Sequence, residues 1–403
     1  MKSENILRWA VLAPGRIART FVGDLLTDPA TRNVTDISHK LVAVGSRSLD
    51  RARGFIDSFE QLKGQDVRAY GSYEELVQDK EVDIVYIASP HNFHHAHSKL
   101  SLLAGKNILC EKPMTVNAEQ AEDIFRISTE KQLFAMEAVW TRFFPSIPKI
   151  QEIIDTGKIG DVLQVQADFG IPSDPKTVPA SDRIFNPELA GGGLLDLGAY
   201  CWTWLAETLL AQSTLYAKDS QDMSGSTYVS KDIMIPKIKA SSVMYRHPEA
   251  KPDSLPVDGS TVAILEFPMA SGKTIQGIME TSITRPTLEE RAVTIYGSTG
   301  QIRIPFPTNA PHEFFVSDYI KHTENIIIYN PNPQKPVETR YFYPMPSEGL
   351  GYMWEADEAA RCIFAKKLES PVVPHRETVR TMKVLDEIRH QIGLVYPPEV
   401  EQA

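Results

Sequence analysis

Several titratable side chains directly follow apolar runs that are predicted to be β-strands. His91 comes two residues after the run Val82–Ser89, and Glu111 and Lys112 come directly after the run Asn107–Cys110. These are side chains of the kinds that transfer protons in enzymes. In an open sheet with helices on both faces, ligands bind outside the carboxyl ends of the strands. We therefore expect Lys112 at the mouth of a ligand cleft, where the proline that follows it fixes the chain.

A second group of such side chains lies in the segment 191–200, which reads Gly-Gly-Gly-Leu-Leu-Asp-Leu-Gly-Ala-Tyr. Glycines let a backbone pass close to a ligand. Asp196 and Tyr200 are four residues apart, so in a helix they would share one face. The alternative is structural: Asp196 would cap a helix or hold the glycine loop, and Tyr200 would be a core aromatic whose hydroxyl is bonded to backbone.

A strand-to-helix turn near the start of the chain has the form of a phosphate-binding turn. The apolar run Trp9–Ala13 leads through Gly15 into a helical pattern. Gly15 would let the backbone approach a pyrophosphate at the helix N-terminus, where free N–H groups and the helix dipole favour anions. Ala13 stands where the pattern Gly-x-Gly-x-x-Gly/Ala has its first glycine, and Ala18 would allow close packing of helix on strand. Because such turns also occur without a ligand, this turn alone does not establish a nucleotide site.

The end of the second predicted strand indicates which dinucleotide fits. The strand Leu41–Gly45 ends in Ser46, Arg47 and Ser48, with no acidic residue. An acidic side chain there would bind the ribose 2′-hydroxyl of NAD, whereas an arginine flanked by hydroxyls accommodates a 2′-phosphate. The pattern therefore favours NADP, the alternative for Arg47 being a solvated charge at a strand end. The spacing from the turn is long because Thr27–His39 is an insertion.

The first part of the chain alternates strand and helix patterns. Apolar runs without strict alternation suit strands covered on both faces, which means a parallel sheet. One helix begins at Asn117 as N-cap, with Gln120 as its capping-box partner. Repeated units of this kind predict a doubly wound α/β domain, a Rossmann fold, over residues 1–144. The runs are Trp9–Ala13, Leu41–Ser46, Val82–Ser89, Asn107–Cys110 and Leu133–Ala138, with helical patterns at Arg16–Leu26, Ser72–Val77, His94–Ala104 and Ala118–Lys131.

The pattern changes after residue 144. Better alternation and frequent turns between about 215 and 345 predict a large, open, mostly antiparallel sheet with one face free for a partner. We assign 145–403 to a second α/β domain for substrate binding and dimerisation, with C-terminal helices that can pack back on the first domain. Its further predicted elements are a helix at Ser146–Thr156, a strand at Val162–Phe169, and helices at Met353–Lys367 and Glu377–Ile392.

Length and composition limit the possible classes of protein. A chain of 403 residues is too long for one ordinary core and predicts two domains. The net charge of −10 argues against a nucleic-acid partner, and no apolar run is long enough to cross a membrane. The first residues lack the apolar core of a signal peptide. Cys110, Cys201 and Cys362 lie far apart, which fits a reducing compartment, so we expect a soluble, cytoplasmic protein.

Three features together resemble one known family. The dinucleotide turn, the Glu-Lys-Pro at 111–113 and the Gly-Gly-x-Leu-x-Asp-x-Gly at 191–198 are similar to the signatures of the Gfo/Idh/MocA oxidoreductases. The block 137–145, which reads Glu-Ala-Val-Trp-Thr-Arg-Phe-Phe-Pro, and the tyrosine at 200 resemble one branch of that family. This branch holds the dimeric dihydrodiol dehydrogenases and the fungal NADP-dependent D-xylose 1-dehydrogenases. The insertion Thr27–His39 is most similar to the xylose-oxidising members.

The resemblance implies an activity and a partner. The activity would be oxidation of D-xylose at C1 to D-xylonolactone by hydride transfer to NADP, with trans-1,2-dihydrobenzene-1,2-diol dehydrogenase as the alternative. A third interpretation is a non-catalytic NADP-sensing regulator, which the retained Lys112 disfavours. Members of the family pair through the C-terminal sheet, so the resemblance implies a homodimer that acts on a small-molecule sugar or diol.

The resemblance also implies how protons move. In this branch a lysine and a tyrosine act together, and they correspond to Lys112 and Tyr200. Oxidation sends a hydride to the nicotinamide while a base takes the hydroxyl proton. A free tyrosine has a pKa of about 10, so work near neutral pH needs a pKa lower by about two to three units. We expect Tyr200 to be the base and the Lys112 ammonium to lower its pKa.

The predicted site can now be collected. We expect no metal site, because no carboxylate or thiolate completes a ligand set with the histidines at 91, 94, 95 and 97. The predicted cofactor-binding residues are Ala13, Gly15, Arg16, Ile17, Ser46, Arg47, Ser89, His91, Glu111 and Lys112. The predicted catalytic residues are Lys112 and Tyr200, and the predicted substrate-binding residues are Trp140, Arg142, Arg183, Asp196 and Tyr200.

Overall fold

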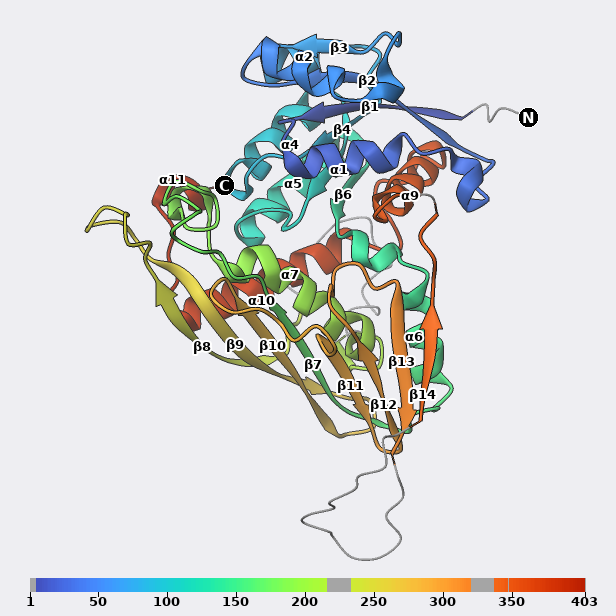
Figure 1. The fold of residues 1–403 in the computed structure, drawn as a ribbon, viewed down its shortest axis with the longest axis vertical. Coiled ribbons are helices and arrows are strands. Elements are labelled where there is room, and N and C mark those ends of the chain that lie inside the picture. Colours follow the sequence, from blue (N-terminus) through green and yellow to red (C-terminus); the bar gives the residue numbers. More distant parts are fainter. Residues whose placement is uncertain (1–4, 216–232, 320–336, 347, 403) are drawn as a thin grey trace, which may run out of the picture.

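The computed structural model of the chain describes residues 5–215, 233–319, 337–346 and 348–402. Within these residues the strands form two sheets, one in each half of the chain (Figure 1). The first sheet has six strands in the order β3-β2-β1-β4-β5-β6, and the second has eight in the order β14-β13-β12-β11-β7-β10-β9-β8. The predicted fold class is confirmed. Parts of the predicted sheet region 215–345, namely 216–232 and 320–336, lie outside the described residues, as do residues 1–4.

All pairs in the first sheet are parallel. The elements are β1 Ile6–Leu12, α1 Arg16–Leu25, β2 Ser38–Gly45, α2 Leu49–Asp57, β3 Arg68–Tyr70, α3 Tyr73–Val77, β4 Ile84–Ile87, α4 His94–Leu103, β5 Asn107–Glu111, α5 Ala118–Lys131 and β6 Ala135–Ala138. Sequence patterns missed α2, which is rich in charge, and β3, which has three partly exposed residues. Asn117 is the N-cap of α5 as predicted, and the Gln120 side chain accepts from the Val116 N–H, one residue before the cap.

The second domain begins with a helix and with β7, which is an inner strand of its sheet. Its elements are α6 Ser146–Asp155, β7 Val162–Gly170, α7 Gly193–Leu205, β8 Lys237–Tyr245, β9 Val257–Pro268, β10 Thr274–Ser282, β11 Val293–Gly297, β12 Gly300–Ile304, β13 Glu313–Asp318, β14 Glu338–Phe342, α9 Tyr352–Phe364, α10 His375–Ile392 and α11 Pro398–Glu401. The pair β7–β10 is parallel, and the other pairs are antiparallel. Among the described residues, none of the helices has the length and hydropathy that crossing a membrane requires.

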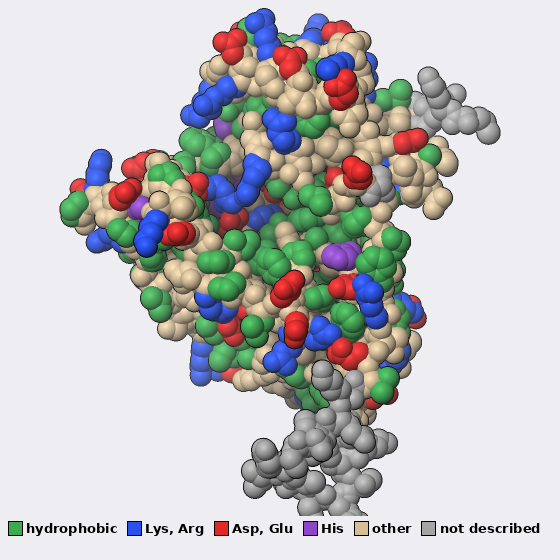
Figure 2. All heavy atoms as spheres, in the orientation of Figure 1, with side chains coloured by type: hydrophobic (Ala, Val, Ile, Leu, Met, Phe, Trp, Pro, Cys, Tyr) green, Lys and Arg blue, Asp and Glu red, His purple; other side chains and the backbone are tan. Residues whose placement is uncertain are grey.

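One face of the second sheet is covered by helices. Helix α7 packs across β7, β9 and β10, and α10 packs on β8 and on α5 of the first domain. Buried and exposed side chains therefore alternate along β9, since successive side chains of a strand point to opposite faces. Ala263, Leu265 and Phe267 are buried, whereas Val262 and Ile264, which alternate with them, are 42% and 37% exposed. The two domains meet along a hollow in the surface where lysine and arginine side chains gather (Figure 2).

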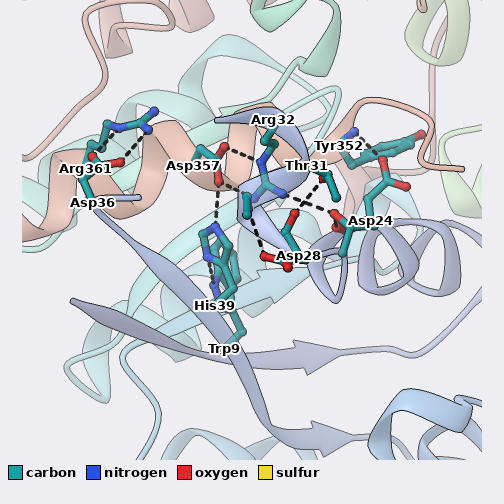
Figure 3. A network of polar contacts seen from close by, with 12 residues as sticks. Trp9, Asp24, Asp28, Thr31, Arg32, Asp36, His39, Tyr352, Asp357 and Arg361 are labelled. Carbon is teal, nitrogen blue, oxygen red and sulfur yellow. Dashed lines mark hydrogen bonds and ion pairs between the residues drawn. The ribbon is translucent and has the colours of Figure 1, made fainter. Parts of the chain in front are cut away.

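Helix α9 belongs to the second half of the sequence but packs on α1 of the first domain. The Asp357 carboxylate on α9 accepts from Nε and Nη2 of Arg32, each at 2.7 Å, and from His39 Nε2 at 2.9 Å (Figure 3). Trp9 Nε1 donates to His39 Nδ1, so Nε2 carries the imidazole proton and donates to Asp357. Burial lowers the pKa of His39, which keeps the ring neutral. The insertion Thr27–His39 therefore supplies the contacts that hold α9.

Asp24 of α1 holds the start of the same helix. Its buried carboxylate accepts the backbone N–H groups of Leu350, Gly351 and Tyr352 at 2.7–3.0 Å. The first N–H groups of a helix have no partner within the helix, and an anion beside them is favoured by the helix dipole. Asp24 and Asp357 thus fix α9 at two points along its length. We call these contacts, with Arg32 and His39, the α9 clasp.

From the α9 clasp we expect two similar substitutions to lower the free energy of unfolding by unequal amounts. Asp357→Asn removes the charge opposite a guanidinium that is 3% exposed, and should lower the free energy of unfolding by about 3 kcal/mol. Asp36→Asn removes the partner of Arg361 in the same region, but those side chains are 55% and 43% exposed, so the loss should stay below about 1 kcal/mol. Urea unfolding followed by circular dichroism measures both. Equal losses would contradict the view that burial makes the Asp357 contact the stronger one.

Candidate active site

The structure brings the predicted amine and phenol together. Lys112 directly follows β5, and its Nζ lies 4.5 Å from the centroid of the Tyr200 ring, on α7. The same Nζ donates to the Asp196 backbone carbonyl and, at 3.0 Å, to Asp196 Oδ1. The ammonium therefore sits over the face of the phenol ring rather than at its hydroxyl. Such a cation–π contact joins the two domains at the carboxyl end of a Rossmann strand.

The glycine-rich segment forms the start of α7. The packing around this start requires glycine. Asp196 and Tyr200 lie one turn apart on this helix, as their spacing predicts. Gly192 has φ of +110°, and a Cβ there would lie 2.1 Å from Asp258 Oδ1. The other oxygen, Asp258 Oδ2, accepts the Leu194 N–H at 2.7 Å and so holds the helix N-terminus. Sequence patterns did not single out Asp258, because only the fold brings β9 against this turn.

The hydroxyl of Tyr200 faces Trp140. Trp140 Nε1 donates to Tyr200 Oη at 3.0 Å, and Tyr200 is 5% exposed. Burial raises the pKa of Tyr200 to about 12, and the Lys112 ammonium opposes this rise. The expectation of a net fall in this pKa is therefore wrong. Loss of solvation outweighs the nearby positive charge, which is itself paired with Asp196. At neutral pH the phenol of this structure is protonated.

Asp196 is the centre of the charged contacts. Its Oδ2 accepts from Arg183 at 2.9 Å, its Oδ1 from Lys112, and His91 Nε2 lies 3.8 Å from Oδ1. Although burial favours the neutral acid, Lys112 and Arg183 hold the pKa of Asp196 below its ordinary value. Burial also puts the pKa of His91 well below its ordinary value, so its imidazole is neutral. Asp196 thus anchors the cations of the site as a carboxylate.

The turn after β1 has the geometry that a pyrophosphate needs. Ala13 has φ of +66°, the left-handed conformation that favours glycine, and its N–H donates to the Gly45 carbonyl. Gly15 is the N-cap of α1 and gives it no side-chain cap; a Cβ there would meet no atom nearer than 4.0 Å. The first N–H groups of α1, at Arg16 and Ile17, are therefore free of a capping side chain and suit an anion. The residues fit a dinucleotide.

The end of β2 lies beside a second arginine that sequence patterns missed. Ser46 is buried and its N–H donates to the Tyr70 carbonyl, while Arg47 is exposed. Burial raises the pKa of Tyr73, and the positive charges of Arg47 and Arg51 oppose this rise. Arg51 lies on α2, a helix that the sequence patterns did not predict, and for this reason Arg51 was not among the predicted residues.

Two predicted residues are engaged elsewhere. Arg142 pairs with Glu207 at 3.2 Å and donates to the Val372 carbonyl, and the structure does not join it to the Lys112–Tyr200 pair. Glu111 accepts from the Tyr86 hydroxyl inside the first domain. Burial raises the pKa of Glu111 to about 7. The charge of Glu111 still reaches the predicted catalytic pair, because it raises the pKa of Lys112 and of Tyr200.

The histidines after β4 serve separate contacts. His94 Nε2 lies 2.8 Å from the Ser89 carbonyl, His97 Nδ1 lies 2.9 Å from Ser89 Oγ, and His95 pairs with Asp123. The contacts of His94 and His97 hold Ser89, two residues after the end of β4. In the described part of the chain, no group of three or more His, Cys, Asp or Glu side chains is arranged to hold a metal ion.

Fold and site together define a two-domain, nicotinamide-nucleotide-dependent oxidoreductase. A model of the oxidoreductase family with an NAD-binding Rossmann fold matches residues 7–138, and a model of the GFO/IDH/MocA C-terminal domain matches residues 147–303. The chain belongs to the Gfo/Idh/MocA oxidoreductase family. The domain boundary predicted at residue 144 falls between the two matched segments.

Curated relatives match along the whole chain. A D-xylose 1-dehydrogenase (NADP(+)) from Hypocrea jecorina is 38% identical, over 97% of this chain and 93% of the relative. A trans-1,2-dihydrobenzene-1,2-diol dehydrogenase from Bos taurus is 32% identical, over 98% and 99%. Among solved structures, a levoglucosan dehydrogenase with NADH and levoglucosan has a TM-score of 0.73 at 17% identity, over 98% of this chain and 100% of the other. At that identity the structural likeness shows the fold alone.

The left-handed Ala13 predicts an unusual response to glycine. Ala13→Gly relieves a conformation that costs a residue with a Cβ about 1–2 kcal/mol, and should raise the free energy of unfolding by up to about 1 kcal/mol after the greater chain entropy of glycine is counted. Ala10→Gly, in the middle of β1 and fully buried, is the matched control and should lower it by about 1 kcal/mol. Urea unfolding distinguishes the two, and equal destabilisation would show that Ala13 carries no strain.

Proposed function

We propose that the chain oxidises D-xylose at C1, converting D-xylose and NADP to D-xylonolactone and NADPH. The single observation that supports dehydrogenase activity is the contact of the Lys112 amine with the Tyr200 phenol at the end of β5. The sugar is suggested by the relative from Hypocrea jecorina, whose similarity spans nearly the whole of both chains. The Asp196 carboxylate and the half-exposed Arg183 beside this pair offer hydrogen-bonding partners that suit a polyhydroxylated substrate.

NADP is the cofactor. The uncapped N-terminus of α1, behind Gly15, would hold its pyrophosphate, and Arg47 with Arg51 would hold its 2′-phosphate. Ser89 and His91 follow β4 and would lie along the nicotinamide half. When bound there, NADP supplies the acceptor for the hydride that leaves C1. The relative from Hypocrea jecorina carries NADP(+) in its name.

The side chains of the site manage the proton. As the C1–H bond breaks and a C1=O bond forms, the C1 hydroxyl loses its proton to the Tyr200 oxygen, which serves as base in its phenolate form. The Lys112 ammonium favours that phenolate, and Asp196 holds Lys112 in place. Because the pKa of Tyr200 is about 12 in this structure, only a small fraction is ionised near neutral pH.

The activity is tested by mixing the pure protein with D-xylose and either NADP or NAD. We expect the near-ultraviolet absorbance of the reduced nicotinamide to grow, and to grow faster with NADP. The kcat/KM for oxidation should rise by about tenfold per pH unit through the neutral range, because the phenolate fraction rises in that proportion below the pKa. Tyr200→Phe should lower kcat by at least about 100-fold and abolish this rise.

Other outcomes assign other functions. Oxidation of trans-1,2-dihydrobenzene-1,2-diol without oxidation of any aldose would favour the alternative that the relative from Bos taurus suggests. The similarity of this chain to that relative covers 99% of the relative's length. Binding of NADP without turnover of an aldose or a diol would favour a regulator. Turnover by Tyr200→Phe at the wild-type rate across the pH range would overturn the role given to the phenol.

We also propose a homodimer that forms through the face of the second sheet opposite α7. On this face Ile264 lies between Lys239 on β8 and Ile278 on β10, with Val262 two residues away. Apolar side chains ringed by polar ones are typical of a protein interface. Val243, 72% exposed on β8, extends the apolar part of this face.

The dimer predicts a change in mass with one substitution. Sedimentation velocity should give twice the mass of one chain for the wild type, and the mass of one chain for Ile264→Glu, because a charge at the centre of the contact would be buried without a partner. Leu103→Glu is the control, since Leu103 is 55% exposed on α4, away from this sheet. A wild type with the mass of a single chain would contradict the proposal.

We further place the protein in the cytoplasm. Cys110, Cys201 and Cys362 are free and buried thiols. Burial raises the pKa of each of them, which keeps them protonated and unreactive. Such a chain has no need of an oxidising compartment and is typical of a reducing one.

A further inference from the structure

The phenol of Tyr200 has one neighbour that is held from outside the site. Trp140 follows β6 and starts a short 3₁₀ turn, and its Nε1–H donates to Tyr200 Oη at 3.0 Å. A phenol oxygen both donates and accepts, whereas an indole nitrogen only donates. Trp140 therefore occupies an accepting position of Tyr200 and leaves the phenol's own O–H to point at another group, such as a substrate hydroxyl.

The direction of the Trp140 N–H depends on the plane of its ring. The torsion that turns an aromatic ring about its bond to Cβ is soft, so neighbours must fix the plane. The ring of Tyr352 stacks on Trp140 with centroids 4.0 Å apart and planes 8° apart, and the edge of Phe144 closes another side at 5.5 Å. Tyr352 is the parallel neighbour, and it sets the orientation of the indole.

Tyr352 is in turn fixed by the first domain. It is the first residue of α9, and its N–H donates to Asp24 Oδ2 of α1 at 2.8 Å (Figure 3). Gly351 before it has φ of +117°, and a Cβ there would lie 2.5 Å from Phe144 Cζ. The chain can therefore place Tyr352 against Trp140 only with glycine at 351. The contacts run from α1 through α9 to the catalytic phenol.

We propose that Tyr352 is a positioning residue for proton transfer at Tyr200, acting through the Trp140 hydrogen bond that its stacked ring holds in place. The proposal rests on the proposed function, since it requires Tyr200 to exchange the substrate proton. A donor aimed at the phenol oxygen stabilises the phenolate, and a tilted donor stabilises it less. A loss of stacking should therefore make Tyr200 a weaker acid and a slower catalyst.

Two substitutions at 352 separate stacking from the hydroxyl. Tyr352→Phe keeps the ring and should leave kcat and the pH profile as in the wild type. Tyr352→Leu keeps an apolar side chain but removes the parallel ring; it should lower kcat for oxidation about tenfold at neutral pH and move the rise of kcat/KM to higher pH. The KM for NADP should not change. Trp354→Leu is the matched control on the same helix. Trp354 meets the edge of Phe144, so its loss should leave the pH profile as in the wild type.

A double-mutant cycle with Trp140→Phe makes the route explicit. Trp140→Phe removes the donor and should reproduce the loss of Tyr352→Leu, and the double variant should be no worse than Trp140→Phe alone, because both act through one hydrogen bond. A merely structural role of Tyr352 would lower the melting temperature without moving the pH profile. Independent, additive losses in the cycle would overturn the route through Trp140.

The remaining outcomes separate this inference from the proposed function. If Tyr200→Phe loses activity while Tyr352→Leu keeps the wild-type pH profile, the proposed function stands and the positioning role is refuted. If Tyr200→Phe keeps full activity, the proposed function itself fails. A loss in Tyr352→Phe as large as that in Tyr352→Leu would also refute the role of the stacked ring.

Discussion

The contact of Lys112 with Asp196 is the interaction on which the site depends. It crosses from the end of a Rossmann strand to the first turns of α7, and it holds an ammonium over the Tyr200 ring. Both side chains are largely removed from water, so each charge needs the other. The carboxylate is also shared with Arg183, which prevents it from being protonated. Without this pair, the two domains would present an amine and a phenol with no fixed relation.

Burial and charge act in opposite directions on the phenol. Loss of water raises the pKa of Tyr200, and the ammonium, divided between the carboxylate and the ring, only partly offsets that rise. The phenol of this structure therefore keeps its proton at neutral pH, and forming the phenolate costs free energy. The Trp140 N–H is a second stabilising group for that phenolate. In the proposed reaction its alignment would matter alongside the charge of Lys112.

Helix α9 connects stability with the site. Asp24 and Asp357 hold it to the first domain, and its first side chain stacks on Trp140. The insertion Thr27–His39, which supplies Arg32 and His39, thus supports the wall of the site from the opposite end of the sequence.

The sequence by itself determined every Rossmann strand except β3, and it determined the large second sheet, because periodicity is a local signal. It placed Lys112 at a strand end and Asp196 and Tyr200 on one helix face, and the resemblance to the family joined the amine to the phenol. It could also place Ala13 and Gly15 at the start of α1. Only the tertiary structure decided that Arg142 pairs with Glu207 and that the pKa of Tyr200 rises. It alone placed Asp258, Arg51 and Tyr352, since burial and contacts between distant segments leave no pattern along one chain. Desolvation is a property of what surrounds a group, and the surroundings exist only once the chain has folded.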